Sequence, residues 1–303
     1  MTWKDGKMEL RVLRYFLAVA REESISGAAD FLHLTQPTLS KQLMGLEEEL
    51  NAKLFIRGNR GITLTDKGML LRKRAEEITS LADKTTAEFS VADEVISGDI
   101  YIGGGETDAM RLIARASEKF QKRYPNVRYH LFSGNADDVT ERLDKGLLDF
   151  GVLIEPADIK KYDYIQLPAT DIWGLLMRKD SPLASQNTIQ PEDLWNIPLI
   201  CSRQTQVSEE ISEWIQMDFE KLNVVATYNL VYNASLMVAE GLGYALCLDK
   251  LVNTTENTNL CFIPLKPRLE ARLDIVWKKY QVFSRAAGKF LESIQDDFSS
   301  STI

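Results

Sequence analysis

Residues Ala28–Phe55 read AADFLHLTQPTLSKQLMGLEEELNAKLF, and this stretch decides how the N-terminal part of the chain folds. Thr35 is placed to cap a helix, and Pro37 falls in its first turn, where a missing backbone N–H costs nothing. Asn51 stands where a left-handed residue can end that helix. Its apolar residues recur at helical spacing and predict one buried stripe: Leu39, Leu43, Leu46 and Leu50.

The other face of this predicted helix is short-chained and polar at its N-terminal end. It carries Gln36, Pro37, Ser40, Lys41 and Met44, while the acidic run 47–49 is kept to the far end. Gln pairs bidentately with adenine, and Ser and Lys reach base edges or phosphates. A helix, a tight turn and a second helix with such a face are what reading the major groove requires. A surface helix of a small bundle remains the alternative from these residues alone.

The flanking residues supply the rest of a small helical domain. A first helix is predicted over Leu10–Glu22, and a second, short one over Gly27–Leu32, capped by Ser24 or Ser26. His33-Leu34 is a tight connection to the helix quoted above.

A β-hairpin wing is predicted after that helix. Leu54-Phe55-Ile56 and Ile62–Leu64 read as strands around the turn Arg57-Gly58-Asn59-Arg60-Gly61. Arg57 and Arg60 at its tip are placed to grip phosphates or enter a minor groove.

A long helix, capped by Thr65, follows the wing. Its apolar or small residues are spaced alternately by four and three, a heptad seam that predicts pairing of two subunits. The seam comprises Leu71, Ala75, Ile78, Ala82, Thr85, Phe89 and Ala92. The alternative is a lone helix packed on its own domain. Ser97-Gly98-Asp99 ends the helix as a plausible hinge.

Strands alternate with helices beyond this hinge, which predicts a parallel sheet. The first lobe is predicted from strands at 100–102, 127–132 and 149–154 and helices at 108–124 and 136–145. The second lobe is predicted from strands at 171–178, 198–202, 224–230 and 244–248 and helices at 209–222 and 234–240. Ligands of such α/β lobes bind at the C-terminal ends of strands, near helix N-termini.

Composition excludes several classes of protein. The 303 residues, 45% hydrophobic and 26% charged, predict about two globular domains, and no apolar run approaches the roughly 18 residues that span a membrane. The start lacks a signal peptide, and three widely spaced cysteines fit a reducing cytoplasm, so we expect a cytoplasmic protein. Residues 1–90 carry net charge +1 and the remainder −9. A near-neutral first segment beside an acidic body suggests that one end meets a polyanion.

The stretch LRYFLAVAREESISGAADFLHLTQPTLSKQLMGLEEELNAKLF resembles the helix-turn-helix of the LysR-type transcriptional regulators almost throughout. LFIRGNRGITLTDKG is similar to that family's wing, with Arg57, Arg60, Leu64, Thr65 and Gly68 in place. GDIYIGGG, FQKRYPNV, DKGLLDFGVLI and VAEGLGYAL resemble landmarks of its effector domain. The resemblance covers about residues 9–292 and is most specific up to residue 68.

The resemblance implies an all-α winged helix-turn-helix over 1–68, a linker and dimerisation helix with hinge over 69–97, and an α/β effector domain over 98–303. That last domain would have two lobes, like periplasmic binding proteins. Proteins of this kind bind double-stranded DNA as homodimers or homotetramers, sense a small molecule and regulate transcription through RNA polymerase. No metal or cofactor is expected beyond that small-molecule effector, and no membrane partner.

Site residues carry over by motif. The resemblance places Gln36, Pro37, Thr38, Ser40 and Lys41 against DNA, with Arg57 and Arg60 at the wing. It places Thr107, Asn135 and Ser202 in the effector cleft. Glu106 departs from the family pattern, because it puts a negative charge in the first cleft loop. Many members bind carboxylates, and for this reason we do not carry an anionic ligand over to this chain.

The residues themselves leave some of these roles open. Glycines at 103–105 precede Thr107 at a helix start, Asn135 occupies the corresponding turn, and Ser202-Arg203 begin a turn in the second lobe. Such convergent polar groups suit a small polar ligand, although Thr107 and Asn135 can equally be helix caps. Glu106 is either a ligand partner for an amine or, as we favour at this point, a solvated acid at a helix start.

Two other functions fit the sequence poorly. An enzyme would need a catalytic motif, and neither a nucleophile elbow nor a phosphate-binding loop is present. An exported transport protein would need a leader.

The cysteines raise a separate question, that of redox sensing. Cys201, expected in a cleft-side loop, would need an activated thiolate and a resolving partner to sense oxidants, and Cys247 is expected in a core strand.

Overall fold

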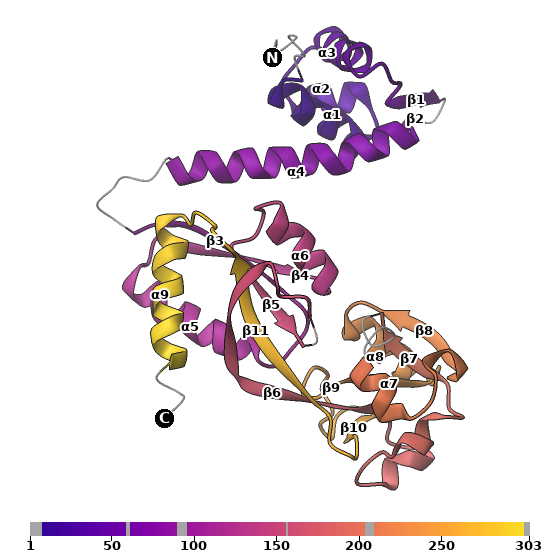
Figure 1. Cartoon of the computed structure of the whole chain (residues 1–303). Coiled ribbons are helices and arrows are strands. Elements are labelled where there is room, and N and C mark those ends of the chain that lie inside the picture. The colour runs from indigo at the N-terminus through magenta and orange to yellow at the C-terminus, as the bar shows by residue number, and fades with distance from the viewer. Residues whose placement is uncertain (1–7, 59–60, 90–95, 156, 204–208, 300–303) are drawn as a thin grey trace. The chain divides into compact units, whose positions relative to one another are not determined.

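The computed structural model describes residues 8–58, 61–89, 96–155, 157–203 and 209–299. The chain divides into two compact units, residues 1–90 (unit 1) and 91–303 (unit 2) (Figure 1). No helix among these residues is both long enough and apolar enough to cross a membrane.

Unit 1 begins with three helices joined by tight turns. They are α1 (Leu10–Glu22), α2 (Ile25–Phe31) and α3 (Gln36–Glu49). Ser24 caps α2 by accepting from the Gly27 N–H, and Thr35 caps α3 by accepting from the Thr38 N–H. Asn51 has φ +45°, as the predicted helix end requires. These local signals were confirmed because each acts within a few residues of the chain.

The core of unit 1 lies between these helices. Leu39, Leu43 and Leu46 of α3 are buried, but Leu50 caps the helix and is 37% exposed, so its predicted place in the stripe is wrong. Phe16 of α1 is fully buried, with its ring centroid 5.2 Å from that of Phe55. The buried stripe leaves the opposite side of α3 to solvent.

The predicted wing is present as β1 (Phe55–Gly58) and β2 (Gly61–Leu64), paired antiparallel from Phe55↔Leu64 to Gly58↔Gly61. Thr65 Oγ donates to the Lys53 carbonyl and accepts from the Gly68 N–H, which starts the next helix as predicted. A Cβ on Gly68 would lie 2.1 Å from the Leu54 carbonyl oxygen, so only glycine fits there. Arg60 lies outside the described residues.

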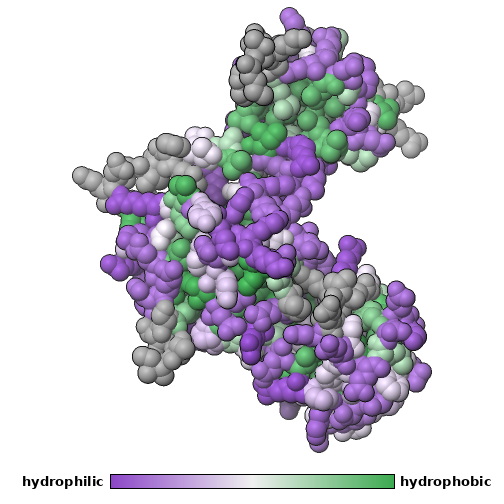
Figure 2. All heavy atoms as spheres, in the orientation of Figure 1, coloured by the Kyte–Doolittle hydropathy of each residue, from purple (hydrophilic) through white to green (hydrophobic). Residues whose placement is uncertain are grey.

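Helix α4 (Asp66–Phe89) completes unit 1. Of the predicted seam, Leu71 and Ala75 pack into the core of unit 1 and Ala75 is fully buried, whereas Ile78 is 40% exposed. Among the side chains of α4 that the structure describes, the large exposed apolar residues are Met69, Leu70, Leu81 and the seam residue Ile78, and Figure 2 shows hydrophobic residues reaching the surface of unit 1. Ala92 lies outside the described residues. The first part of the predicted seam therefore stabilises the domain itself.

Unit 2 contains a continuous ladder of strands with the order β4-β3-β5-β11-β6-β9-β7-β8, and β10 also pairs with β6. The strands are β3 (Gly98–Gly104), β4 (Val127–Ser133), β5 (Phe150–Ile154), β6 (Tyr162–Arg178), β7 (Leu199–Ser202), β8 (Val224–Tyr228), β9 (Tyr244–Leu248), β10 (Leu260–Pro264) and β11 (Glu270–Lys278). The helices are α5 (Met110–Arg123), α6 (Ala136–Asp144), α7 (Glu209–Ile215), α8 (Val231–Ala239) and α9 (Arg285–Ser299), with short 3-10 turns at Pro182–Ser185, Pro191–Leu194 and Phe219–Lys221.

Two lobes share this ladder. The first lobe comprises β3, β4, β5, β11, α5, α6 and α9, and the second comprises β7 to β10, α7 and α8. Strand β6 belongs to both, since its first part pairs with β11 and its last part with β9 and β10 (Figure 1). Phe290 of α9 is at the centre of the first core and meets Phe120, Tyr129 and Phe150 edge-on.

The predicted parallel sheet holds for only part of unit 2. Strands β3, β4 and β5 are parallel, as are β7, β8 and β9, but β11 runs antiparallel to β5 and β6. The Ser97–Asp99 hinge is replaced in part by β3, which begins at Gly98 with φ +121°. The predicted helix at 209–222 ends at Ile215, and a 3-10 turn at Phe219–Lys221 follows.

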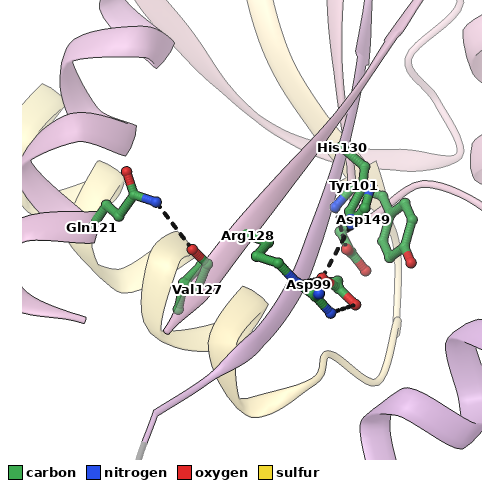
Figure 3. A network of polar contacts seen from close by, with 7 residues as sticks. All are labelled: Asp99, Tyr101, Gln121, Val127, Arg128, His130 and Asp149. Atoms are coloured by element: carbon green, nitrogen blue, oxygen red, sulfur yellow. Dashed lines mark hydrogen bonds and ion pairs between the residues drawn. The ribbon is translucent and has the colours of Figure 1, made fainter. Parts of the chain in front are cut away.

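The outer strand β4 is tied to β3 by a polar network (Figure 3). The Arg128 guanidinium donates twice to the Asp99 carboxylate, at 2.8 and 3.2 Å, and His130 Nε2 lies 3.1 Å from the same carboxylate. The Tyr101 and His130 rings stack with centroids 4.6 Å apart, and the Tyr101 N–H donates to Asp149. Burial alone would raise the pKa of Asp99, but the hydrogen bonds from His130 and Arg128 hold it below its ordinary value.

Candidate functional site

The exposed face of α3 gathers the predicted DNA-contacting side chains in one place. Gln36, Pro37, Thr38 and Lys41 are exposed and Ser40 is partly exposed, all on the first turns of the helix. The Thr35 and Thr38 hydroxyls are 2.8 Å apart, which orders the helix start. Lys41 has no ion-pair partner among the described residues, so its charge is available to a phosphate or a base edge.

The wing is less fully defined. The backbone of Arg57 pairs with Ile62 in the hairpin, two residues from the turn. Arg60 lies in the part of the turn outside the described residues, so its predicted role is untested.

A cavity of about 640 Å³ opens between the two lobes of unit 2. Four of the five predicted effector residues line it: Glu106 and Asn135 from the first lobe, and Ser202 and Arg203 from the second. They lie at the end of β7 or in the turns that follow β3, β4 and β7, where ligands of such lobes are expected. The structure thus brings together residues that are up to 97 positions apart in the chain.

Thr107 is not among the residues lining this cavity. It is 7% exposed, its Oγ donates to the Asp171 carboxylate and accepts from the Ala109 N–H at 3.1 Å. It lines a smaller cavity of about 370 Å³ instead. Burial raises the pKa of Asp171, while the Thr107 hydroxyl opposes that shift. Thr107 therefore bonds to the shared strand β6, and its predicted effector contact stays a prediction.

Asn135 combines both roles that the sequence left open. Its side-chain oxygen accepts from the Asp138 N–H at 2.9 Å, and Asp138 accepts from the Asn135 N–H, which makes a capping box at the start of α6. Asn135 also lines the cavity, so one residue serves as the cap of α6 and as part of the cavity wall.

Glu106 differs from the expected solvated acid. Its carboxylate accepts from the Val231 N–H at the start of α8, in the second lobe. Helix α8 has no capping side chain of its own, so Glu106 provides the missing acceptor across the cavity. This contact joins two residues separated by 125 positions, and no local pattern predicts it.

Sequence reasoning missed other residues of the cavity wall. They include Glu155, Asp158, Lys161, Tyr162, Trp173, Glu210 and Tyr228. Glu155 directly follows β5 and Tyr228 ends β8, so the rule that ligands bind at strand ends was a signal for these two. The others come from the loop before β6, from β6 itself, whose length was not anticipated, and, for Glu210, from the start of α7.

Two of the three cysteines, Cys201 and Cys247, are buried in strands of the second lobe. Cys201 is fully buried in β7 rather than in a cleft-side loop, and burial raises the pKa of its thiol to about 12. The pKa of Cys247 is likewise raised to about 12, chiefly by burial. A thiol that stays protonated is a poor target for oxidants. Among the described residues, no group of three His, Cys, Asp or Glu side chains is arranged to hold a metal ion.

Comparison with known proteins assigns this architecture to a class. Residues 10–69 match the model of the bacterial regulatory helix-turn-helix protein of the lysR family, and residues 93–299 match the LysR substrate binding domain. The chain therefore belongs to the LysR family of transcriptional regulators, with a DNA-binding helix-turn-helix and an effector-binding domain.

Individual relatives agree along nearly the whole chain. An uncharacterized HTH-type transcriptional regulator of Bacillus subtilis, YwbI, is 31% identical over 94% of this chain and 95% of its own length. A probable RuBisCO transcriptional regulator of Synechocystis is 27% identical over 97% of this chain and 88% of its own length. The crystal structure of full-length CbnR with its target DNA has a TM-score of 0.74 at 19% identity, covering 95% of this chain and 99% of that one. These relatives are regulators rather than enzymes.

Proposed function

We propose that this protein binds a specific DNA operator as a homodimer or homotetramer and that a small molecule in the unit 2 cavity modulates this binding. The observation that carries the proposal is the exposed polar start of α3. Gln36, Ser40 and Lys41 lie on the solvent side of the helix, and its leucines pack into the core on the other side. A rigid helix with short polar side chains at its N-terminal end is suited to the major groove. Its action would take place in the cytoplasm and reach transcription through RNA polymerase.

The residues have distinct proposed roles. Gln36 and Ser40 read base edges, while Lys41 and the wing arginines Arg57 and Arg60 hold the phosphate backbone. Pro37 and Thr38 shape the approach of the helix start. Asn135, Ser202, Arg203 and Glu106 face the effector, and Thr107, which directly follows Glu106, bonds to Asp171.

A gel-shift titration on DNA from beside the protein's own gene tests the proposal. Gln36→Ala should weaken binding to that DNA by about 1–3 kcal/mol and leave binding to random DNA nearly unchanged. Gln42→Ala, on a different face of the same helix, is the matched control and should bind both DNAs like the parent protein. Equal losses on both DNAs for Gln36→Ala would show that this residue only positions the protein, and no specific shift at all would refute the operator.

A further inference from the structure

The wall of the unit 2 cavity is strongly acidic. Six carboxylates come from the first-lobe side, namely Glu106, Asp137, Asp138, Asp144, Glu155 and Asp158, and Glu210 comes from the second lobe. Among the residues of the wall that the structure describes, two cations, Lys161 and Arg203, face them, which leaves this part of the wall with a net charge of −5. A cavity of this charge favours a cation and repels an anion.

Two helix starts at the cavity, those of α6 and α8, already meet acidic side chains of the chain itself. Helix α6 is capped by Asn135 and Asp138, and Asp137 also lies in its first turn. Helix α8 is met by the Glu106 carboxylate from the opposite lobe. The positive ends of both helix dipoles are therefore neutralised by the chain's own acids. An anionic ligand would have to displace them.

A second, independent feature lies directly behind the wall. Asp274 of β11 is 1% exposed, and neither of its carboxylate oxygens has a hydrogen-bond partner among the described residues. Asp274 is opposite Leu153 of β5, and Glu155, two residues further along, lies on the same side of the sheet. Two neighbouring carboxylates, one of them buried and unpartnered, lack a positive charge that a ligand beside Glu155 would supply.

Aromatic rings in the cavity wall favour an organic ammonium ion over a metal ion. Trp173, Tyr162 and Tyr228 line the cavity, and such rings attract ammonium groups and pack against hydrocarbon. A bare metal ion would need converging ligands, and the described residues offer no such group. The cavity volume of about 640 Å³ falls within the range of pockets that bind small organic ligands.

We propose that the cavity binds a small aliphatic cation with two or more ammonium groups. The Glu155 side takes one ammonium group, the aromatic rings cover the hydrocarbon, and Glu210 across the cavity meets the other charged end. The inference rests on the proposed effector-binding role of this cavity and specifies the chemistry of the effector.

Calorimetric titration of the full-length protein without DNA tests this inference, at one ionic strength throughout. The probes are spermidine and 1,5-diaminopentane, compared with succinate, benzoate and magnesium chloride. We expect a saturable heat with at least one of the two amines, and at least about tenfold weaker binding of the other three probes. Glu155→Gln should weaken amine binding about tenfold. Glu118→Gln removes an exposed acid of α5 outside the cavity and should change nothing.

Several outcomes would overturn the inference. These are tighter binding of succinate or benzoate, no saturable amine binding at millimolar concentration, or equal effects of Glu155→Gln and Glu118→Gln. Asp158→Asn, in a loop of the cavity wall, replaces Glu155→Gln should that variant fail to fold. Because binding is measured without DNA, failure here leaves the gel-shift test of the operator intact. Conversely, amine binding that never alters the gel shift would refute effector control while the ligand chemistry stands.

Discussion

At the scale of single residues, Asp274 is a source of pH-dependent stability. Burial and the neighbouring Glu155 raise its pKa to about 6, and when protonated it can donate to the Glu155 carboxylate. A carboxyl group whose folded-state pKa is raised stabilises the fold fully below its ordinary pKa and loses that contribution as the pH rises through about 6. At neutral pH the ionised group therefore opposes folding.

Asp274→Asn should accordingly stabilise unit 2 at pH 7.5, by at most about 3 kcal/mol, and the gain should shrink towards zero near pH 4. Urea unfolding followed by tryptophan fluorescence measures this, since four of the five tryptophans lie in unit 2. Asp163→Asn, an exposed acid on β6, is the control and should show little change at either pH. A variant that is no more stable than the parent at pH 7.5 would contradict the assigned burial cost.

Thr107 illustrates a second residue whose role lies in the interior. Thr107→Val should cost about 1–3 kcal/mol of unfolding free energy, because it leaves the buried Asp171 carboxylate without its hydroxyl donor. Thr107→Ser keeps the hydroxyl and should retain most of the stability. Thermal unfolding of the three proteins distinguishes them. Unchanged stability of Thr107→Val together with lost ligand binding would instead return Thr107 to the effector site.

At the scale of elements, the Asp99 network fixes the outer strand β4 to β3 (Figure 3). Asp99→Asn should destabilise unit 2 by about 1 kcal/mol at pH 7, because the hydrogen bonds from Arg128 and His130 then meet a neutral group. A depressed carboxyl pKa stabilises above the ordinary value of about 4 and loses that contribution as the pH falls below it. Urea unfolding of parent and variant should therefore converge in acid. A constant difference at every pH would contradict this account.

Helix α4 offers an exposed apolar row for pairing of subunits. Leu81→Asp or Ile78→Asp should lower the sedimenting mass, because both side chains are about two-fifths exposed rather than part of the unit 1 core. Ser80→Asp, on the opposite side of the helix, should leave the mass unchanged. If all three variants sediment alike, α4 is not where subunits meet. Ala75→Asp is unsuitable as a test, since Ala75 is buried and the variant should unfold unit 1.

The elements also show what could be read from the sequence. Caps, turns and leucine spacing at α2, α3 and the wing act over a few residues, so they were predictable from local patterns. Strand β11 was not anticipated, since its apolar run is interrupted by Asp274 and it inserts antiparallel between β5 and β6. Four of the five predicted effector residues line the cavity, because turns after strands are recognisable in a sequence. Their hydrogen bonds to Asp171 and Val231, which join distant segments, could not be found in this way.

At the scale of the whole molecule, units 1 and 2 divide the work of the protein between them. Unit 1 contains the complete core beneath α3, and unit 2 contains the complete cavity. Under the proposed function, a change in the cavity reaches DNA through the arrangement of the proposed subunits, because α3 is packed into the core of unit 1. Effector response should therefore be tested as a change in assembly or DNA bending as well as in affinity.

The shared strand β6 has a consequence for how the protein is made. A ribosome releases the chain from its N-terminus, so unit 1 can fold while unit 2 is still being synthesised. Strands β7 to β10 emerge before β11 and α9, yet the first lobe needs both of these last elements to close its sheet and core. The first lobe, although most of it precedes the second in sequence, can therefore complete its fold only after the last residues of the chain have been synthesised. A premature stop codon after β10 would deprive the nascent protein of its first lobe, although most of that lobe's codons had already been translated.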